Sequence, residues 1–308
     1  MKMVKNERGQ TIVFTVISLA VLLGMCALVL DVGAWFHQKR QLQATADAAA
    51  LAGAQFLPKN PGTALTTAVA YAGKNGGGVS AGDISVTSSR TTNDTISVKA
   101  KKTNSGIFSR VLGVVSVNIG ASAKARVGAP AQARYVAPMV VSCKHPFIHH
   151  CFDGDSDPDF GKTTQMNFDP MGAPGAFGML NLDGQNGTVG TSKEATWITR
   201  GFDKLLGLGK YRSDPGAKFS SQEIRGALDG RLNTVLLFPV FRTLSGQGQQ
   251  AQYEIIGWIG FYLQGYTTNG NNAVLKGYFT EFIAKGIQAS SGQGSPLAFG
   301  VRTVQLIG

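Results

Sequence analysis

The sequence predicts an α+β protein with a single membrane-spanning helix near its N-terminus, and three observations support this. Residues 11–30 contain no charged side chain, and an alanine-rich tract with helical spacing follows them directly. The rest of the chain is rich in glycine, 40 residues in all, and in segments that alternate apolar with polar side chains. Such a composition favours loops and strands over a helical bundle. We predict three parts: an anchor and stalk helix at 1–58, a small α/β module at 59–128 and a β-rich domain at 129–308.

The apolar run from Thr11 to Leu30 is long enough to cross a membrane. Twenty residues at 1.5 Å each span about 30 Å, the thickness of a bilayer's hydrocarbon core. The run is longer than the apolar region of a cleaved signal peptide. Cys26 follows Met25 rather than the small residue expected before a lipoprotein cysteine. We therefore expect an uncleaved, single-pass anchor.

The charge pattern orients this anchor. Lys2, Lys5 and Arg8 precede the run, and positive residues beside a first span tend to stay in the cytoplasm. We expect an N-terminus inside the cytoplasmic membrane and the bulk of the chain in the periplasm or outside the cell. Residues 1–128 hold 14 Lys and Arg against 5 Asp and Glu, which suits an anionic lipid surface such as that of the inner membrane. No dense basic patch with interleaved aromatic residues occurs, so nucleic acid is not an expected partner.

The helical pattern continues beyond the membrane as a stalk. Alanine has the highest helix propensity, so the tract is expected to be helical. We expect Pro58 and Pro61 to end this helix. Apolar and small residues recur at spacings of three, four or seven: Val32, Trp35, Leu42, Ala46, Ala49 and Gly53. Small side chains let helices approach closely. This stripe therefore predicts a docking surface for a helical partner or tight packing on the chain's own fold, with a rigid spacer as the alternative.

These residues resemble a known family. The combination of RGQ, an apolar span, Asp31-Val32-Gly33 and QLQATADAAALAGA is similar to the N-terminal segment of TadG-like proteins. Those are membrane-anchored proteins of the Tad (Flp) tight-adherence pilus machinery, related to the TadE and TadF minor pilins. The resemblance implies a role in pilus assembly, with other Tad machinery proteins or minor pilins as partners. One feature departs from prepilins, which carry Glu at the fifth mature position: cleavage after Gly9 would place Phe14 there.

The module at 59–128 is predicted to have the order αββαβ, which is pilin-like in size. A helix is expected at 63–74 and a helical turn at 107–112. Alternating apolar residues predict strands around Ile84 and Val86, around Ile96, Val98 and Ala100, and from Val117 to Val127.

The region 129–308 is predicted to be a mostly antiparallel β domain with a few helices. One helix is expected to carry Trp197, Ile198, Phe202 and Leu205, and another to begin with a capping box at Ser220-Ser221-Gln222-Glu223. Strands are expected at 135–141, 178–182, 235–241, 253–262, 273–279 and 301–307.

The densest cluster of chemically active side chains is CKHPFIHHCFDGDSDPDF, residues 143–160. Cys143 and Cys151 are the only cysteines beyond the span, and outside the cytoplasm such a pair tends to form a disulfide. The alternative is a zinc site that combines these cysteines with His145 or His149, although the usual paired ligand spacings are missing.

The same segment contains a calcium candidate. Alternate acidic side chains resemble a Ca²⁺ loop: Asp153, Asp155, Asp157 and Asp159. An EF-hand is excluded because Pro158 stands at the position of its glycine and Thr164 at that of its final Glu. An irregular calcium loop and a solvated acidic turn remain as the two interpretations, and no other cofactor is expected.

The chain contains no phosphate-binding loop, and we do not expect an enzyme. The leading hypothesis is a non-enzymatic envelope protein that docks partners through its N-terminal helix during pilus assembly or presentation. The alternative is a cell-surface or matrix-binding adhesin in which residues 129–308 form the binding module.

Overall fold

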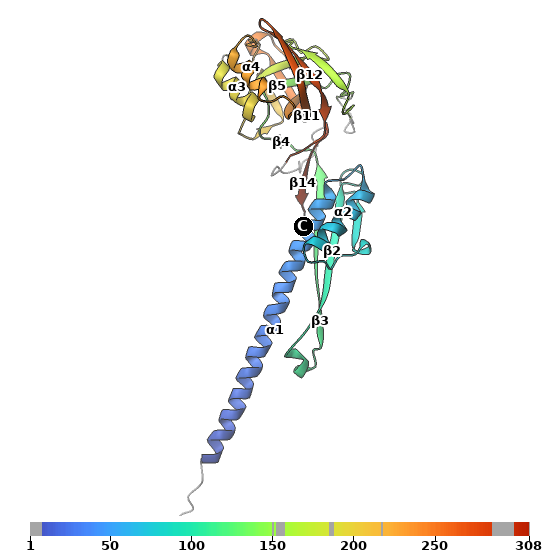
Figure 1. Ribbon diagram of the computed structural model, residues 1–308, viewed down its shortest axis with the longest axis vertical. Coiled ribbons are helices and arrows are strands. Elements are labelled where there is room, and N and C mark those ends of the chain that lie inside the picture. The colour runs from blue at the N-terminus through green and yellow to red at the C-terminus, as the bar shows by residue number, and fades with distance from the viewer. Residues whose placement is uncertain are drawn as a thin grey trace, which may run out of the picture. The chain divides into compact units, whose positions relative to one another are not determined.

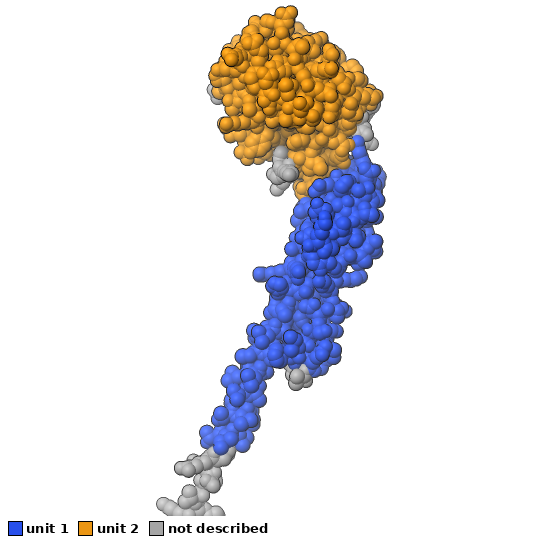
Figure 2. Space-filling model, in the orientation of Figure 1, with its two compact units in different colours: residues 1–126, 306–308 blue, residues 127–305 orange. Residues whose placement is uncertain are grey.

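The computed structural model describes residues 8–149, 151, 158–184, 188–216, 218–284 and 299–307. The chain divides into two compact units, coloured separately in Figure 2. Unit 1 comprises Met1–Arg126 with Leu306–Gly308, and unit 2 comprises Val127–Gln305. The stalk helix and the small α/β module thus belong to one unit. The fold is α+β, with a long apolar N-terminal helix and many antiparallel strands.

Unit 1 is a long helix onto which a second helix and a three-stranded antiparallel arrangement pack (Figure 1). In chain order its elements are α1 (Arg8–Ala54), α2 (Pro61–Lys74), the 3-10 helix η1 (Ala81–Asp83), β1 (Ile84–Thr87), β2 (Thr95–Ser105), the 3-10 helix η2 (Ser109–Leu112) and β3 (Ser116–Gly128). The expected helical turn at 107–112 is therefore a 3-10 turn over its last four residues. Strand β2 pairs with β1 on one side and with β3 on the other.

The core of unit 1 is built from unusually small side chains. Ala64, Ala68 and Ala72 recur every four residues on the buried face of α2, while Ile96 and Val98 come from alternate positions of β2. Opposite β2, strand β3 contributes alanines in register, with Val98 facing Ala123. Because side chains alternate across a strand, one face of the sheet lies in the core and the other is polar.

Unit 2 is a mostly antiparallel β domain. Its strands are β4 (Gln132–Ala133), β5 (Met139–Ser142), β6 (Thr163–Asn167), β7 (Phe177–Asn181), β8 (Leu206–Gly207), β9 (Gly209–Ser213), β10 (Val235–Ser245), β11 (Gln252–Asn269), β12 (Asn272–Thr280), β13 (Phe282–Ile283) and β14 (Val301–Leu306). Its helices are α3 (Thr191–Arg200), α4 (Gln222–Asp229) and the 3-10 helix η3 (Gly248–Gln250). The main sheet has the order β10-β5-β7-β9-β11-β12-β6, and an additional pairing of β10 with β11 closes five of these strands into a ring.

Aromatic side chains fill the core of unit 2. Phe238 of β10 stacks on Phe261 of β11 with ring centroids 5.1 Å apart, and both are fully buried. The indole N–H of buried Trp258 donates to the carbonyl of Pro130, 3.2 Å away, so its polar atom is satisfied. Large rings supply most of the apolar area buried in such a domain.

Two local expectations are corrected by unit 2. Helix α3 ends at Arg200, because Gly201 takes a φ of 76°, so Phe202 and Leu205 lie beyond the helix. Helix α4 is capped by Ser221, whose Oγ accepts the N–H of Glu223 at 3.2 Å. The Glu223 carboxylate does not complete the predicted reciprocal box; the hydroxyl of Ser192 donates to it instead.

Candidate functional site

The N-terminal half of α1 has the surface of a membrane span. Every residue from Thr11 to Leu30 is exposed except half-buried Ala27. Within the described residues, α1 is the one helix long and apolar enough to cross a membrane, with a mean hydropathy of 2.8 in its most apolar stretch. An apolar surface on all sides of a helix is stable in lipid and costly in water. This surface is consistent with a single-pass membrane anchor.

The span ends at a carboxylate that holds a distant loop. Asp31 is buried, and its side chain accepts three consecutive backbone N–H groups. These are Ile107 at 3.1 Å, Phe108 at 2.9 Å and Ser109 at 2.7 Å, at the tip of the β2–β3 hairpin. Hydrogen bonds to an ionised acceptor are among the stronger ones in proteins. Asp31 therefore fixes the hairpin tip against α1 at the residue that directly follows the apolar run.

The C-terminal half of α1 is part of the core of unit 1. Leu42, Ala46 and Ala49 are at most 1% exposed. A Cβ added to Gly53 would lie 2.7 Å from Ile96 Cδ1 and 2.8 Å from the Ala64 carbonyl oxygen, so the backbones of α1 and α2 approach closely there.

This packing corrects the predicted use of the small-residue stripe. The prediction assigned Leu42, Ala46, Ala49 and Gly53 to docking a partner, but they are buried inside unit 1 and are not available to one. Of the remaining stripe residues, Val32 and Trp35 are half-buried. The alternative considered from the sequence, tight packing on the chain's own fold, describes these four residues.

Polar side chains also tie α1 to β3. The ammonium of Lys39 donates to the Gly120 carbonyl, and Gln43 Nε2 donates to the Ser122 carbonyl at 3.0 Å. Lys39 interrupts the apolar stripe in the sequence, and this contact explains why a charged residue is accommodated there. Figure 1 shows the hairpin of β2 and β3 beside the helix.

The segment that forms α1 matches a known protein family. Residues 9–55 match the model of a family described as putative Flp pilus-assembly TadE/G-like. The chain therefore carries a TadE/G-like segment. The matched residues comprise nearly all of α1, both the apolar half and the half packed in unit 1. The match relates the chain to Flp pilus assembly. No curated protein and no solved structure matches the chain.

The TadE/G-like segment has a second face that points away from the rest of unit 1. The residues on this face are separated by four, three, four and four positions, and all are exposed: Val29, Gly33, Phe36, Arg40 and Ala44. Because a helix repeats every 3.6 residues, this outer face lies opposite Asp31, Leu42 and Ala49. No atom outside the helix lies within 4 Å of a Cβ built on Gly33, and Phe36 is 67% exposed.

The cysteines of the Cys/His/Asp segment form a disulfide. Cys143 and Cys151 are joined, with their Cα atoms 5.0 Å apart. Neither sulfur is then a thiolate that can bind zinc. His145 is buried against Phe279, and burial lowers the pKa of His145 to about 4, so its ring is neutral near pH 7. Its Nδ1 accepts the N–H of Phe147 at 3.1 Å.

Of the calcium candidates, the structure describes only Asp159. Asp153, Asp155 and Asp157 lie outside the described residues. The Asp159 carboxylate lies 3.0 Å from both Lys162 Nζ and His149 Nε2, and its pKa is lowered by the hydrogen bond from Lys162 and then by that from His149. Among the described residues, no three His, Cys, Asp or Glu side chains are grouped in a way that could hold a metal ion.

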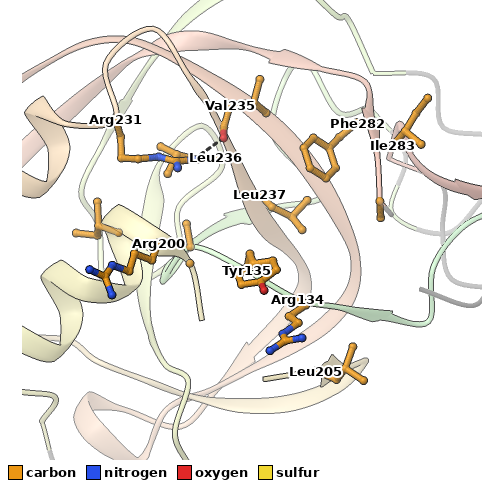
Figure 3. Close-up of a pocket in the computed structure, with 14 residues that line it drawn as sticks. Arg134, Tyr135, Arg200, Leu205, Arg231, Val235, Leu236, Leu237, Phe282 and Ile283 are labelled. Carbon is orange, nitrogen blue, oxygen red and sulfur yellow. Dashed lines mark hydrogen bonds between the residues drawn. The ribbon is translucent and has the colours of Figure 1, made fainter. Parts of the chain in front are cut away.

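Unit 2 also contains an open cavity of about 600 Å³ (Figure 3). Its apolar lining includes Leu236 and Phe282, and three arginines stand around it: Arg134, Arg200 and Arg231. Arg231 donates to the Val235 carbonyl at 2.6 Å, whereas Arg134 lies over the ring of Tyr135, 5.0 Å from its centre. Apolar walls and cationic groups together suit a ligand with an anionic end and an apolar body.

Unit 2 also contains a buried cluster of charged side chains at α3. Lys218 Nζ lies 2.6 Å from Asp214 Oδ2 and 3.2 Å from Glu194 Oε2, and both carboxylates are almost completely buried. Burial raises the pKa of Glu194 to about 7, an effect that Lys218 partly opposes. Glu194 therefore changes its charge near neutral pH. The ion pairs of the cluster join α3, which carries Glu194, to the segment after β9, which carries Asp214 and Lys218. The cluster therefore has a structural role.

Sequence reasoning missed the carboxylate clamp and the hairpin tip. Asp31 had a signal of its own, because it is a lone acid that directly follows twenty uncharged residues. The tip had a weaker one, an apolar stretch between two alternating strands, which we interpreted as an ordinary helical turn. Their connection has no signal in the sequence, since the donors are backbone N–H groups.

Proposed function

We propose that the chain is a membrane-anchored, non-enzymatic component of Tad (Flp) pilus assembly or presentation. Residues 11–30 span the cytoplasmic membrane, the N-terminus is cytoplasmic, and units 1 and 2 lie on the outer side. The observation that carries this proposal is the TadE/G-like segment, which is one continuous helix with an apolar half exposed on all faces. The basic residues before the span support its orientation.

Partners dock on the outer face of α1. The small residues of the inner face are already used by unit 1, so the outer face is the part of the stalk left for a neighbour. Gly33 lets a second helix approach closely, and Phe36 offers a large apolar side chain beside it. These two residues follow the apolar run directly, within reach of the helix of a second membrane-anchored protein.

Co-purification tests this proposal. Tagged full-length chain is extracted from membranes in mild detergent, and the proteins retained with it are identified by mass spectrometry. We expect the native chain to retain Tad membrane proteins and the Phe36→Ala and Gly33→Leu variants to lose them. Tyr71→Ala is the matched control, because Tyr71 is an exposed aromatic residue of α2 in the same unit.

Two results would contradict the proposal in different ways. If every variant retains the same proteins as the native chain, the outer face is not the docking surface. If the native chain retains no protein of the pilus machinery, the proposed role in pilus assembly is wrong.

The cavity of unit 2 favours a second candidate function, an adhesin with unit 2 as its binding module. The three arginines around an apolar lining suit an anionic polymer or amphiphile on a cell or matrix surface. Cells that display the full chain would then adhere to such a surface, and replacing exposed Arg134 and Arg200 by Ala would reduce adhesion. Unchanged adhesion in this double variant would exclude the cavity as the binding site.

A further inference from the structure

The tip of the β2–β3 hairpin, residues 106–115, exposes an unusual amount of apolar surface. Ile107 is 75% exposed and Val115 is 60% exposed, while Phe108 and Val114 are each 42% exposed. Four large apolar side chains thus meet solvent within ten residues. In a soluble domain, such a cluster at a loop end marks a contact surface.

Several backbone N–H groups of this tip have hydrogen-bond partners within unit 1. The Gly106 N–H donates to the Val115 carbonyl at 3.2 Å, and the Val114 N–H donates to the Ser109 carbonyl at 3.0 Å. Asp31 accepts the N–H groups of residues 107–109. Unpaired backbone groups are what exclude most loops from the apolar part of a bilayer. These N–H groups have partners, which removes much of that penalty.

The tip also contacts α1 at a level that suits the boundary of a membrane. Phe108 and Ser109 line a groove with span residues between Val21 and Leu30, and Gly24 and Ala27 are on the same side of the helix as Asp31. From Leu30 to Gly24 the helix descends about 9 Å. Interfacial helices bury their apolar faces to a similar depth of roughly 5–10 Å in the boundary between headgroups and acyl chains.

The charge of the hairpin suits an anionic lipid surface. Residues 95–128 contain no Asp or Glu, and their basic residues are Lys99, Lys101, Lys102, Arg110, Lys124 and Arg126. Arg110 is at the tip itself and is exposed. Basic residues near a bilayer surface are attracted to anionic headgroups. An apolar tip next to strands that carry basic side chains is typical of a segment in a membrane interface.

We propose that the tip of the β2–β3 hairpin inserts into the same bilayer that α1 spans, as a second membrane contact. Ile107, Phe108, Val114 and Val115 lie among the acyl chains next to the headgroups, and Arg110 reaches the headgroups. This inference rests on the proposed membrane anchoring of residues 11–30. Two contact points hold unit 1 at a fixed tilt and a fixed rotation on the membrane surface, which a single helix does not.

Site-directed spin labelling of the full chain in vesicles tests the proposal. The vesicles contain phosphatidylcholine and phosphatidylglycerol, and Cys26→Ser removes the free thiol. Nitroxides are attached in turn at Ile107→Cys, at Thr92→Cys in the turn between β1 and β2, and at Leu22→Cys in the span. Collisions with oxygen, which concentrates in lipid, are compared with collisions with a water-soluble nickel chelate. We expect the nitroxides at 107 and 22 to collide with oxygen and to lose collisions with nickel, and the nitroxide at 92 to behave in the opposite way.

Each other outcome contradicts a defined part of the account. If position 22 is in lipid while position 107 behaves like position 92, the hairpin insertion is wrong and the anchor stands. If position 107 is shielded from both reagents, the tip contacts protein, which also overturns the proposal. If position 22 is itself open to the nickel chelate, the membrane anchoring is wrong and the hairpin insertion fails with it.

Discussion

Replacing Gly53 by alanine tests the close approach of α1 to α2. Helix propensity alone predicts a gain, because Ala is favoured over Gly in a helix interior by about 1 kcal/mol. The new methyl group, however, would lie 2.7 Å from Ile96 Cδ1, 2.8 Å from the Ala64 carbonyl oxygen and 3.1 Å from Ala68 Cβ. Overpacking a core costs about 1–3 kcal/mol, and the backbone contact places this site at the upper end. We expect a net loss of about 2 kcal/mol in the stability of unit 1.

Gly73→Ala is the matched control. Gly73 is helical and exposed, and nothing lies within 4 Å of its added Cβ, so only the propensity gain applies. Hydrogen exchange of the β2 amides in detergent-solubilised full chain reports the opening of unit 1 separately from unit 2. A loss of 2 kcal/mol corresponds to about thirtyfold faster exchange. If Gly53→Ala exchanges as slowly as Gly73→Ala, the packing of α1 on α2 is not as described.

Three further predictions concern charges and the disulfide. Asp31→Asn removes the ionised acceptor at the hairpin tip, so hydrogen exchange of the amides of residues 107–109 should become faster while that of unit 2 does not change. If these three amides exchange as slowly as in the native chain, the clamp is refuted. Because burial raises the pKa of Glu194 to about 7 from 4.5, the folded chain holds a proton there that the unfolded chain has lost. Stability should therefore fall as pH rises from about 4.5 to about 7, by at most ~3 kcal/mol, and level off above pH 7. Denaturant unfolding of Glu194→Gln should lack this dependence, and an unchanged pH profile would contradict the raised pKa. Replacing Cys143 and Cys151 together by Ala should lower the stability of unit 2 by about 2–3 kcal/mol, as calorimetry would show, since the bridge closes only a short loop; an unaltered transition would mean that the bridge contributes nothing.

Patterns of side chains predict most elements, because they record which face of each element is buried. The long helix and the strands with alternating Ile, Val and Ala follow directly from their spacing. Strands β6 and β9 have no such pattern: their sequences, TTQMN and GKYRS, are polar. They become strands because β12 and β11 offer them paired backbones, which is a property of the assembled sheet.

The candidate site is harder to predict for two physical reasons. A small-residue stripe permits close approach, but the same alanines serve a partner helix or the chain's own core, and only the fold shows that Leu42 and Ala46 are used internally. The clamp at Asp31 joins a side chain to backbone N–H groups more than seventy residues away. Every non-proline residue carries such a group, so nothing in the sequence marks the three that Asp31 binds.

The continuity of α1 has a mechanical consequence. Helix α1 runs from Arg8 to Ala54, from the apolar half to the alanines packed under α2 and β2. A stiff rod of this kind transmits torque and tilt from end to end. In the proposed membrane-anchored state, a neighbour that twists or tilts the apolar half of α1 would therefore rotate the whole of unit 1. Displacement of unit 1 would in turn tilt the apolar half.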